Sequence, residues 1–147
     1  MKKLILPTTQ YITETNKLIR SKFPSGNTPY DPLDDLIDYV DKIIYFTPID
    51  RSIIEIAAYY LKNIILLQSF VDFNHRTAIQ ITAEFLEDNG YMTKDLLNIT
   101  QYSVYKKESM IKDYGDLYPE LSEDILVEKD NYMYIDCLNF IKYKLIR

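Results

Sequence analysis

The stretch SIIEIAAYYLKNIILL, residues 52–67, is the feature that most limits the folds open to this chain. Apolar residues occupy nearly every face of a helix drawn through it, so no polar face is left for solvent. A helix of this kind belongs at the centre of a domain, where other helices cover it. We therefore predict a central helix over Ile49–Leu67, with Thr47 as its cap and Pro48 in its first turn.

The rest of the chain predicts further helices around this one, from apolar spacing and from cap residues. Gly90 ends the helix that follows the central one. The segment 24–31, PSGNTPYD, predicts a loop or short flap. One all-α domain over residues 1–147, a compact bundle of six or seven helices, is the expected fold. The other predicted helices are Thr9–Lys22, one capped by Asp31 with Pro32 in its first turn, His75–Asp88, Thr93–Lys107, Glu120–Val127 and Asn131–Leu145.

Composition excludes several classes of function. The net charge of −5 argues against a broad nucleic-acid surface, and three glycines in 147 residues argue against a glycine-rich nucleotide loop. No apolar run is long enough to cross a membrane, and the N-terminus does not resemble a signal peptide. The single cysteine, Cys137, excludes an internal disulfide and is expected to be an inert core residue. We expect a cytoplasmic protein.

The bend QSFVDFN, residues 68–74, joins the central helix to the next one. The amides that open a helix carry the positive end of its dipole, so such a bend suits a phosphate or carboxylate. Arg76 adds a planar cation, and Asp72 suits either loop amides or a metal ion that carries a nucleotide. From these residues alone a structural interpretation is also open. In that interpretation Asp72 or Asn74 caps the helix, and Arg76 forms an exposed ion pair.

The stretch FVDFNHRTAIQITAEFLEDNGY, residues 70–91, resembles the signature of the Fic/Doc (Fido-fold) family, most closely its Doc, or death-on-curing, branch. There the pattern His-Pro-Phe-x-Asp-Gly-Asn-Lys-Arg-Thr-Ala precedes a helix that ends in Leu-x-x-Asn-Gly-Tyr. The resemblance implies a small helical bundle with a nucleotide site at the bend. The matching residues are Phe70, Asp72, Asn74, Arg76, Thr77, Ala78, Phe85, Leu86, Asn89, Gly90 and Tyr91.

The resemblance also implies chemistry. Fic enzymes transfer AMP, and Doc toxins transfer phosphate, from a nucleotide such as ATP to a hydroxyl of a target protein. Phe70 would seat the loop, and Asp72 would hold Mg²⁺ or orient the hydroxyl. Asn74 would position the phosphate, and Arg76 would clamp it. Such transfer depends mainly on positioning and electrostatic stabilisation.

Three positions depart from the family pattern. Gln68 stands where the family has its general-base histidine, and a positioned base contributes roughly 10²–10⁴-fold in rate. Phe73 replaces the glycine of the phosphate loop, although glycine tolerates positive φ and close approach far better. His75 replaces a lysine and is mostly neutral at pH 7.

Two hypotheses follow from these departures. In the first, the chain is a degenerate Doc-like protein, related to toxin–antitoxin systems, that acts by binding a nucleotide or a protein. In the second, it is a working phosphotransferase or AMP-transferring toxin. A Doc-like toxin is restrained by a separate antitoxin, so an antitoxin-like partner and a target protein are expected. Tyr102, Tyr105 and Tyr114 suit a homo-oligomer interface, or they simply reflect a chain with 14 tyrosines.

Overall fold

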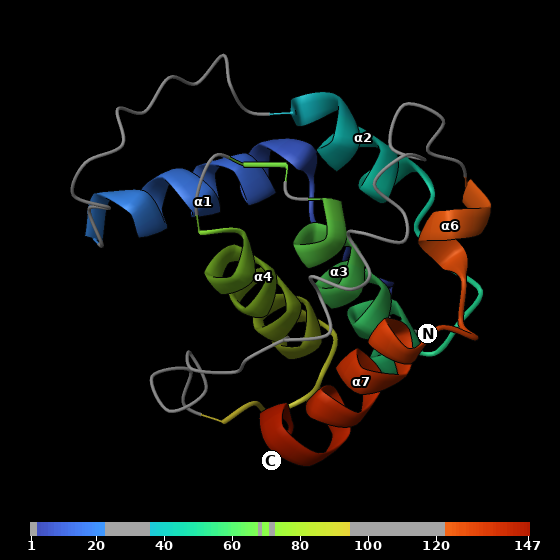
Figure 1. The fold of residues 1–147 in the computed structure, drawn as a ribbon. Helices are drawn as coiled ribbons and strands as arrows, with labels where there is room; N and C mark the ends of the chain where they lie inside the picture. The colour runs from blue at the N-terminus through green and yellow to red at the C-terminus, as the bar shows by residue number, and fades with distance from the viewer. Residues whose placement is uncertain (1–2, 23–35, 68, 71–72, 95–122) are drawn as a thin grey trace.

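A computed structural model describes residues 3–22, 36–67, 69–70, 73–94 and 123–147. These residues form six α-helices and no β-strand, so the protein is all-α, as its sequence predicts. Helix α3 (Ile53–Leu67) runs through the middle of the molecule (Figure 1). The other described helices pack around it, and α4 (Asn74–Asp88) and α7 (Tyr132–Phe140) make the most extensive contacts with α3.

Helix α3 is buried on all of its faces, which confirms the prediction of a central helix. Every residue from Ile56 to Leu67 is buried. The ring of Tyr60 lies edge-on to that of Phe85 in α4, with ring centroids 5.3 Å apart. Such aromatic pairs add about 0.5–1.5 kcal/mol beyond the burial of their area. The contact joins α3 and α4, the two helices that flank the bend.

The start of α3 differs from the prediction, because α3 begins at Ile53. Ser52 and Glu55 form a reciprocal cap: the amide of Glu55 donates to Ser52 Oγ over 3.2 Å, and the amide of Ser52 donates to Glu55 Oε1 over 3.3 Å. Thr47 and Pro48 precede the helix, so their assignment to its first turn was wrong. The hydroxyl of Thr47 instead donates to carbonyl oxygens in the last turn of α2 (Ile37–Tyr45).

Two helices were predicted closely. Helix α1 spans Thr9–Lys22, the predicted range, and packs across α4. Helix α4 begins at Asn74, immediately before the predicted His75, and ends at Asp88. Gly90 follows with φ of 100°, which confirms that a glycine in this conformation closes the helix.

The C-terminal part also follows the predicted order. Helix α6 covers Glu123–Val127. The side chain of Asn131 caps α7 by accepting a hydrogen bond from the amide of Tyr134 over 2.7 Å. The predicted helix continues to Leu145, but its last turn, Ile141–Leu145 (η4), is π-helical rather than α-helical. A wider turn of this kind accommodates an extra residue in a helix.

The helix predicted from Thr93 does not begin there. Thr93 forms an isolated antiparallel bridge with Ile146, and the amide of Lys94 donates to the carbonyl of Leu145 over 2.8 Å. The backbone at this point is therefore tied to the C-terminal segment. Several predictions lie outside the described residues: the rest of that helix, the Asp31–Pro32 start, the 24–31 flap, residues 120–122 and the tyrosines at 102, 105 and 114.

Lys62 is a buried residue that the sequence patterns did not reveal. Its side chain is fully buried in α3, and its ammonium group donates to the carbonyl oxygens of Ile125 at 2.9 Å and Leu126 at 3.0 Å. The amide of Asn63 also donates to the Leu126 carbonyl, over 2.9 Å. These bonds attach α6 to α3. Burial lowers the pKa of Lys62 to about 8, because the charged amine is costly away from water.

Cys137 lies in the core, and burial raises the pKa of its thiol well above its usual range. The uncharged thiol is therefore the stable form, in agreement with the prediction of an inert core residue. Among the helices that the structure describes, none has the length and apolar character that a membrane-spanning helix requires.

Candidate functional site

The bend between α3 and α4 is attached to the hydrophobic core through Phe70. The Phe70 side chain is only 4% exposed and belongs to the same apolar cluster as the buried residues of α3 and α4. Ser69, which precedes it, is also buried, and its carbonyl accepts a hydrogen bond of 2.6 Å from the amide of Leu36. The start of the bend is therefore fixed against both the core and the segment that leads into α2.

Asn74, the first residue of α4, closes the bend on itself. Its Oδ1 accepts a hydrogen bond from the amide of Phe70 over 2.9 Å, and its Nδ2 donates to the carbonyl of Phe70 over 2.8 Å. The side chain is 6% exposed, so both bonds are shielded from water. Buried backbone groups need such partners. These two bonds give Asn74 a structural role, since they tie the first residue of α4 to Phe70.

Phe73 adopts a left-handed backbone conformation, with φ of 59° and ψ of 28°. Among the described residues it is the only non-glycine residue with positive φ. A side chain in this conformation costs roughly 1–2 kcal/mol. Phe73 also begins α4, since its carbonyl accepts the hydrogen bond of 2.9 Å from the amide of Thr77. The position at which the family pattern has glycine therefore has the backbone conformation that glycine favours.

A buried contact between Asn16 and Thr77 fixes the first turn of α4 against α1. The Asn16 Nδ2 donates to Thr77 Oγ1 over 3.0 Å, and both side chains are fully buried. The sequence analysis missed Asn16. A signal was present, because Asn16 lies four residues after Ile12 on the apolar face of α1 and would have to find a polar partner there.

His75 and Arg76 occupy the first turn of α4, and each is partly exposed. A cation at this end of a helix adds to the positive end of the helix dipole. The fork of an arginine matches the geometry of phosphate and carboxylate oxygens. This turn therefore combines a helix N-terminus, a guanidinium group and the Asn74 side chain that bonds the backbone of Phe70, which suits the binding of an anion.

Gln68 and Asp72, the two candidate catalytic residues, lie outside the described residues. Asp72 was also the candidate ligand for Mg²⁺. Within the part of the chain that the structure describes, no group of three or more His, Cys, Asp or Glu side chains could hold a metal ion. The polar side chains described at the start of α4 are the amide of Asn74, the imidazole of His75 and the guanidinium of Arg76, which suit an anion rather than a hard cation.

Comparison of the chain with family models, with curated proteins and with solved structures returned no match.

Proposed function

We propose that this chain is a Doc-like protein of the Fic/Doc family whose active site is degenerate, and that it acts mainly by binding a nucleotide or a protein at the α3–α4 bend. The observation that carries the proposal is the left-handed conformation of Phe73. A phenylalanine in a strained conformation stands where the Fic/Doc pattern, which residues 70–91 resemble, has glycine. Strained backbone of this kind is found preferentially at binding and catalytic sites.

The contacts of the bend support an anionic ligand. The first turn of α4 supplies the positive end of a helix dipole, and Arg76 supplies a permanent cation. The side-chain amide of Asn74 is bonded to the backbone of Phe70. In this proposal Asn74 therefore positions the backbone and does not bind the phosphate. The phosphate itself would then be held by the backbone of the turn and by Arg76. An ATP phosphate has the charge and size that this combination recognises.

Loss of the general base explains why binding is favoured over catalysis. Transfer of phosphate from ATP to a hydroxyl forms a new P–O bond, releases ADP and requires the hydroxyl proton to leave. Gln68 has an amide that does not accept a proton near pH 7. His75, in place of the lysine, does not carry a dependable charge. The chain therefore keeps the residues of the motif that pack in the core, and it lacks the general-base histidine and the lysine of the family pattern.

An active transferase is the second candidate. It is favoured by the two bonds that tie Asn74 to Phe70, because phosphoryl transfer depends strongly on positioning. In this candidate Asp72 orients the hydroxyl of a target protein and Arg76 stabilises the transferred group, phosphate or AMP. Expression in cells would then arrest growth, and Asp72→Ala or Arg76→Ala would relieve the arrest. Toxicity that persists in both variants would exclude this candidate.

Titration calorimetry with ATP and Mg²⁺ tests the proposal directly. We expect the unmodified chain to bind, and Arg76→Ala to weaken binding by at least about tenfold, since it removes a charge-assisted contact. Arg147→Ala is the matched control, because it removes an exposed arginine at the end of the chain. Binding that is absent, or that is reduced equally by both variants, would contradict a nucleotide site at the bend.

A partner protein is the second ligand to test, because Doc-like toxins are restrained by antitoxins. The measurement is affinity capture with the unmodified chain and with Arg76→Ala as bait. A protein retained by the first and lost by the second would identify the bend as its binding surface.

A further inference from the structure

Polar side chains of α3, and of the residues just before it, hold the short helix α6 in place. The carbonyl oxygens of the last three residues of α6 accept hydrogen bonds from these side chains. Such carbonyls have no partner within their own helix and need one from elsewhere. The attachment of α6 is therefore largely polar. The bonds run from Lys62 to Ile125 (2.9 Å) and Leu126 (3.0 Å), from Asn63 to Leu126 (2.9 Å), and from Arg51 to Val127 (2.7 Å).

Apolar contacts contribute little to this attachment. Among the five residues of α6, Leu126 is the only buried one, and Ile125 and Val127 are partly buried. Beside α6 lies an open pocket of about 550 Å³, lined by residues 45–51, Glu123 and Val127, so this flank of the helix is not packed. A helix of five residues is not stable by itself. Segments with few buried apolar contacts open locally before the rest of a fold does.

The buried amine of Lys62 makes the closed position of α6 costly. Burial lowers the pKa of Lys62 to about 8, because a charged amine is costly away from water. Glu128, which follows α6, and Cys137 in α7 act on this pKa in the opposite direction, and Arg51 adds to the effect of burial. The hydrogen bonds to α6 offset this cost only in part, since water offers the same groups equivalent bonds once α6 has moved away.

The position of α6 allows it to move without the other helices. Figure 1 shows α6 at the edge of the bundle, on the side of α3 that faces away from α4. Asn131 caps α7, so residues 128–130 form the connection about which α6 turns. In this connection Lys129 forms an ion pair with Glu55, and exposed pairs of this kind contribute little to stability.

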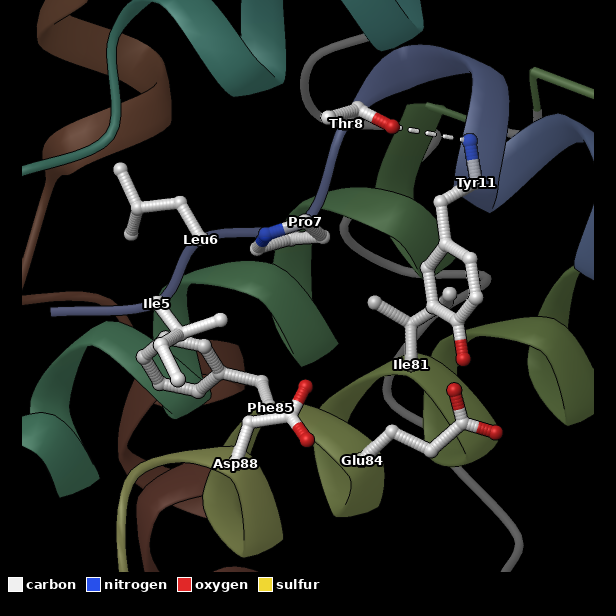
Figure 2. Close-up of a pocket in the computed structure, with 9 residues that line it drawn as sticks. All are labelled: Ile5, Leu6, Pro7, Thr8, Tyr11, Ile81, Glu84, Phe85 and Asp88. Carbon is white, nitrogen blue, oxygen red and sulfur yellow. Dashed lines mark hydrogen bonds between the residues drawn. The ribbon is translucent and has the colours of Figure 1, made fainter.

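Lys62 is not accessible through either of two surface pockets. Its side chain is fully buried. It lines neither the pocket beside α6 nor the pocket of about 300 Å³ between residues 5–8 and α4, which Figure 2 shows. A reagent therefore reaches the amine only after part of the covering structure has opened, and carbonyl oxygens of α6 lie directly on that amine.

We propose that α6 is a latch, which opens away from α3 while the other described helices stay folded, and that the buried amine of Lys62 makes this opening sensitive to pH. In the open form the amine and the side-chain amide of Asn63 face water on the central helix. The open form holds the proton of Lys62 up to pH 10.5, whereas the closed form releases it above about pH 8. Lowering the pH from 10 to 8 therefore raises the ratio of open to closed form by about 30-fold.

Acetylation of lysine side chains tests the proposal, with a short pulse of N-succinimidyl acetate on the full chain and mass spectrometry of its peptides. The rate at Lys62, divided by the rate at the exposed Lys17 of α1, measures the open fraction. We expect this ratio to be well below one at pH 8 and to fall about 30-fold between pH 8 and pH 10. The global unfolding constant, from urea curves at the same pH, should be at least about tenfold smaller than the ratio.

Leu126→Ala and Val40→Ala form a matched pair of variants, because each removes a buried apolar side chain from a different helix. Val40 lies in α2, which stays folded when α6 opens. Leu126→Ala should raise the acetylation ratio at least about tenfold, since the closed form loses its main apolar contact. Val40→Ala should lower the stability of the whole protein and leave the ratio within about twofold of the unmodified value.

Three results would overturn the proposal. One is a ratio equal to the global unfolding constant with the same dependence on urea, which would mean that Lys62 becomes accessible only when the whole chain unfolds. Another is a ratio that does not change between pH 8 and pH 10. The third is an equal increase of the ratio in the two variants. The pH series uses the unmodified chain, so it decides the question even where a variant does not fold.

Discussion

The side chain of Asn74 hydrogen-bonds both backbone groups of Phe70, with its Oδ1 on the amide at 2.9 Å and its Nδ2 on the carbonyl at 2.8 Å. One side-chain amide thus ties the first residue of α4 to Phe70, which follows α3. Because Phe70 is itself in the core, the bend is held from both ends. The candidate site depends on this pairing for its shape.

Asn74→Ala should therefore destabilise the protein strongly. It leaves a buried amide and a buried carbonyl of Phe70 without their partner, which costs about 2–4 kcal/mol. Urea unfolding measures the change. Asn131→Ala is the matched control, because Asn131 caps α7 by accepting one hydrogen bond from a backbone amide. This substitution should lower the free energy of unfolding by about 1 kcal/mol. An Asn74→Ala variant no less stable than Asn131→Ala would contradict the role given to Asn74.

Phe73 provides a test of backbone strain at the same site. Phe73→Gly and Phe73→Ala both remove the ring, but only glycine adopts a φ of 59° without steric strain. We predict that the glycine variant is the more stable of the two by about 1 kcal/mol, the reverse of the usual order at a helix. The free energies of unfolding of the two variants decide this. An alanine variant of equal or greater stability would show that the left-handed conformation is not retained.

Lys62 predicts a pH dependence of stability. Its pKa falls from 10.5 to about 8 on folding, so between these values the unfolded chain holds the proton more tightly than the folded one. The free energy of unfolding therefore falls as the pH is lowered from 10.5 to about 8, by up to about 3 kcal/mol, because the unfolded chain takes up the proton first. Above pH 10.5 the amine is neutral in both states, and this loss is absent. The raised pKa values of Cys137 and Tyr60 act in the opposite direction in alkaline solution.

The comparison with Lys62→Met separates these effects, since the thiol and the tyrosine are present in both proteins. The difference in unfolding free energy, unmodified chain minus variant, should rise as the pH increases from 8 to 10. A difference that stays flat over this range would mean that Lys62 is solvated in the folded protein.

The bond between Asn16 and Thr77 should couple α1 to the candidate site. In a double-mutant cycle of Asn16→Ala and Thr77→Val, we expect a coupling energy of about 1 kcal/mol. Asn16→Ala should also weaken the binding of ATP, although Asn16 is not part of the bend. Strictly additive stabilities, with unchanged ATP binding, would show that α1 does not position the first turn of α4.

The fold was predictable from the sequence where local signals were strong. The spacing of apolar residues and Gly90 placed α1 and α4, and the run without a polar face placed α3 at the centre. The start of α3 was missed because Thr47 and Pro48 imitate a cap, although the pair Ser52 and Glu55 was also readable from the sequence.

The site was less predictable than the fold. Lys62 belongs to an otherwise apolar helix, and only the approach of α6 supplies carbonyl oxygens for its ammonium group. Asn74 was assigned to phosphate or to a helix cap, and no pattern in the sequence could reveal that both its polar atoms bind Phe70, because an amide serves any of these purposes. The roles of Gln68 and Asp72 stay predictions.

Transfer of labelled phosphate or AMP from ATP, measured for the unmodified chain beside Gln68→His/Phe73→Gly, tests the central claim most directly. We predict transfer close to background for the unmodified chain and a clear gain for the double variant, since it restores a base that contributes about 10²–10⁴-fold. A triple variant that adds Arg76→Ala should lose the gain. Strong labelling by the unmodified chain that disappears in Arg76→Ala, or a double variant that binds ATP and transfers nothing, would contradict a Doc-like scaffold with a disabled centre.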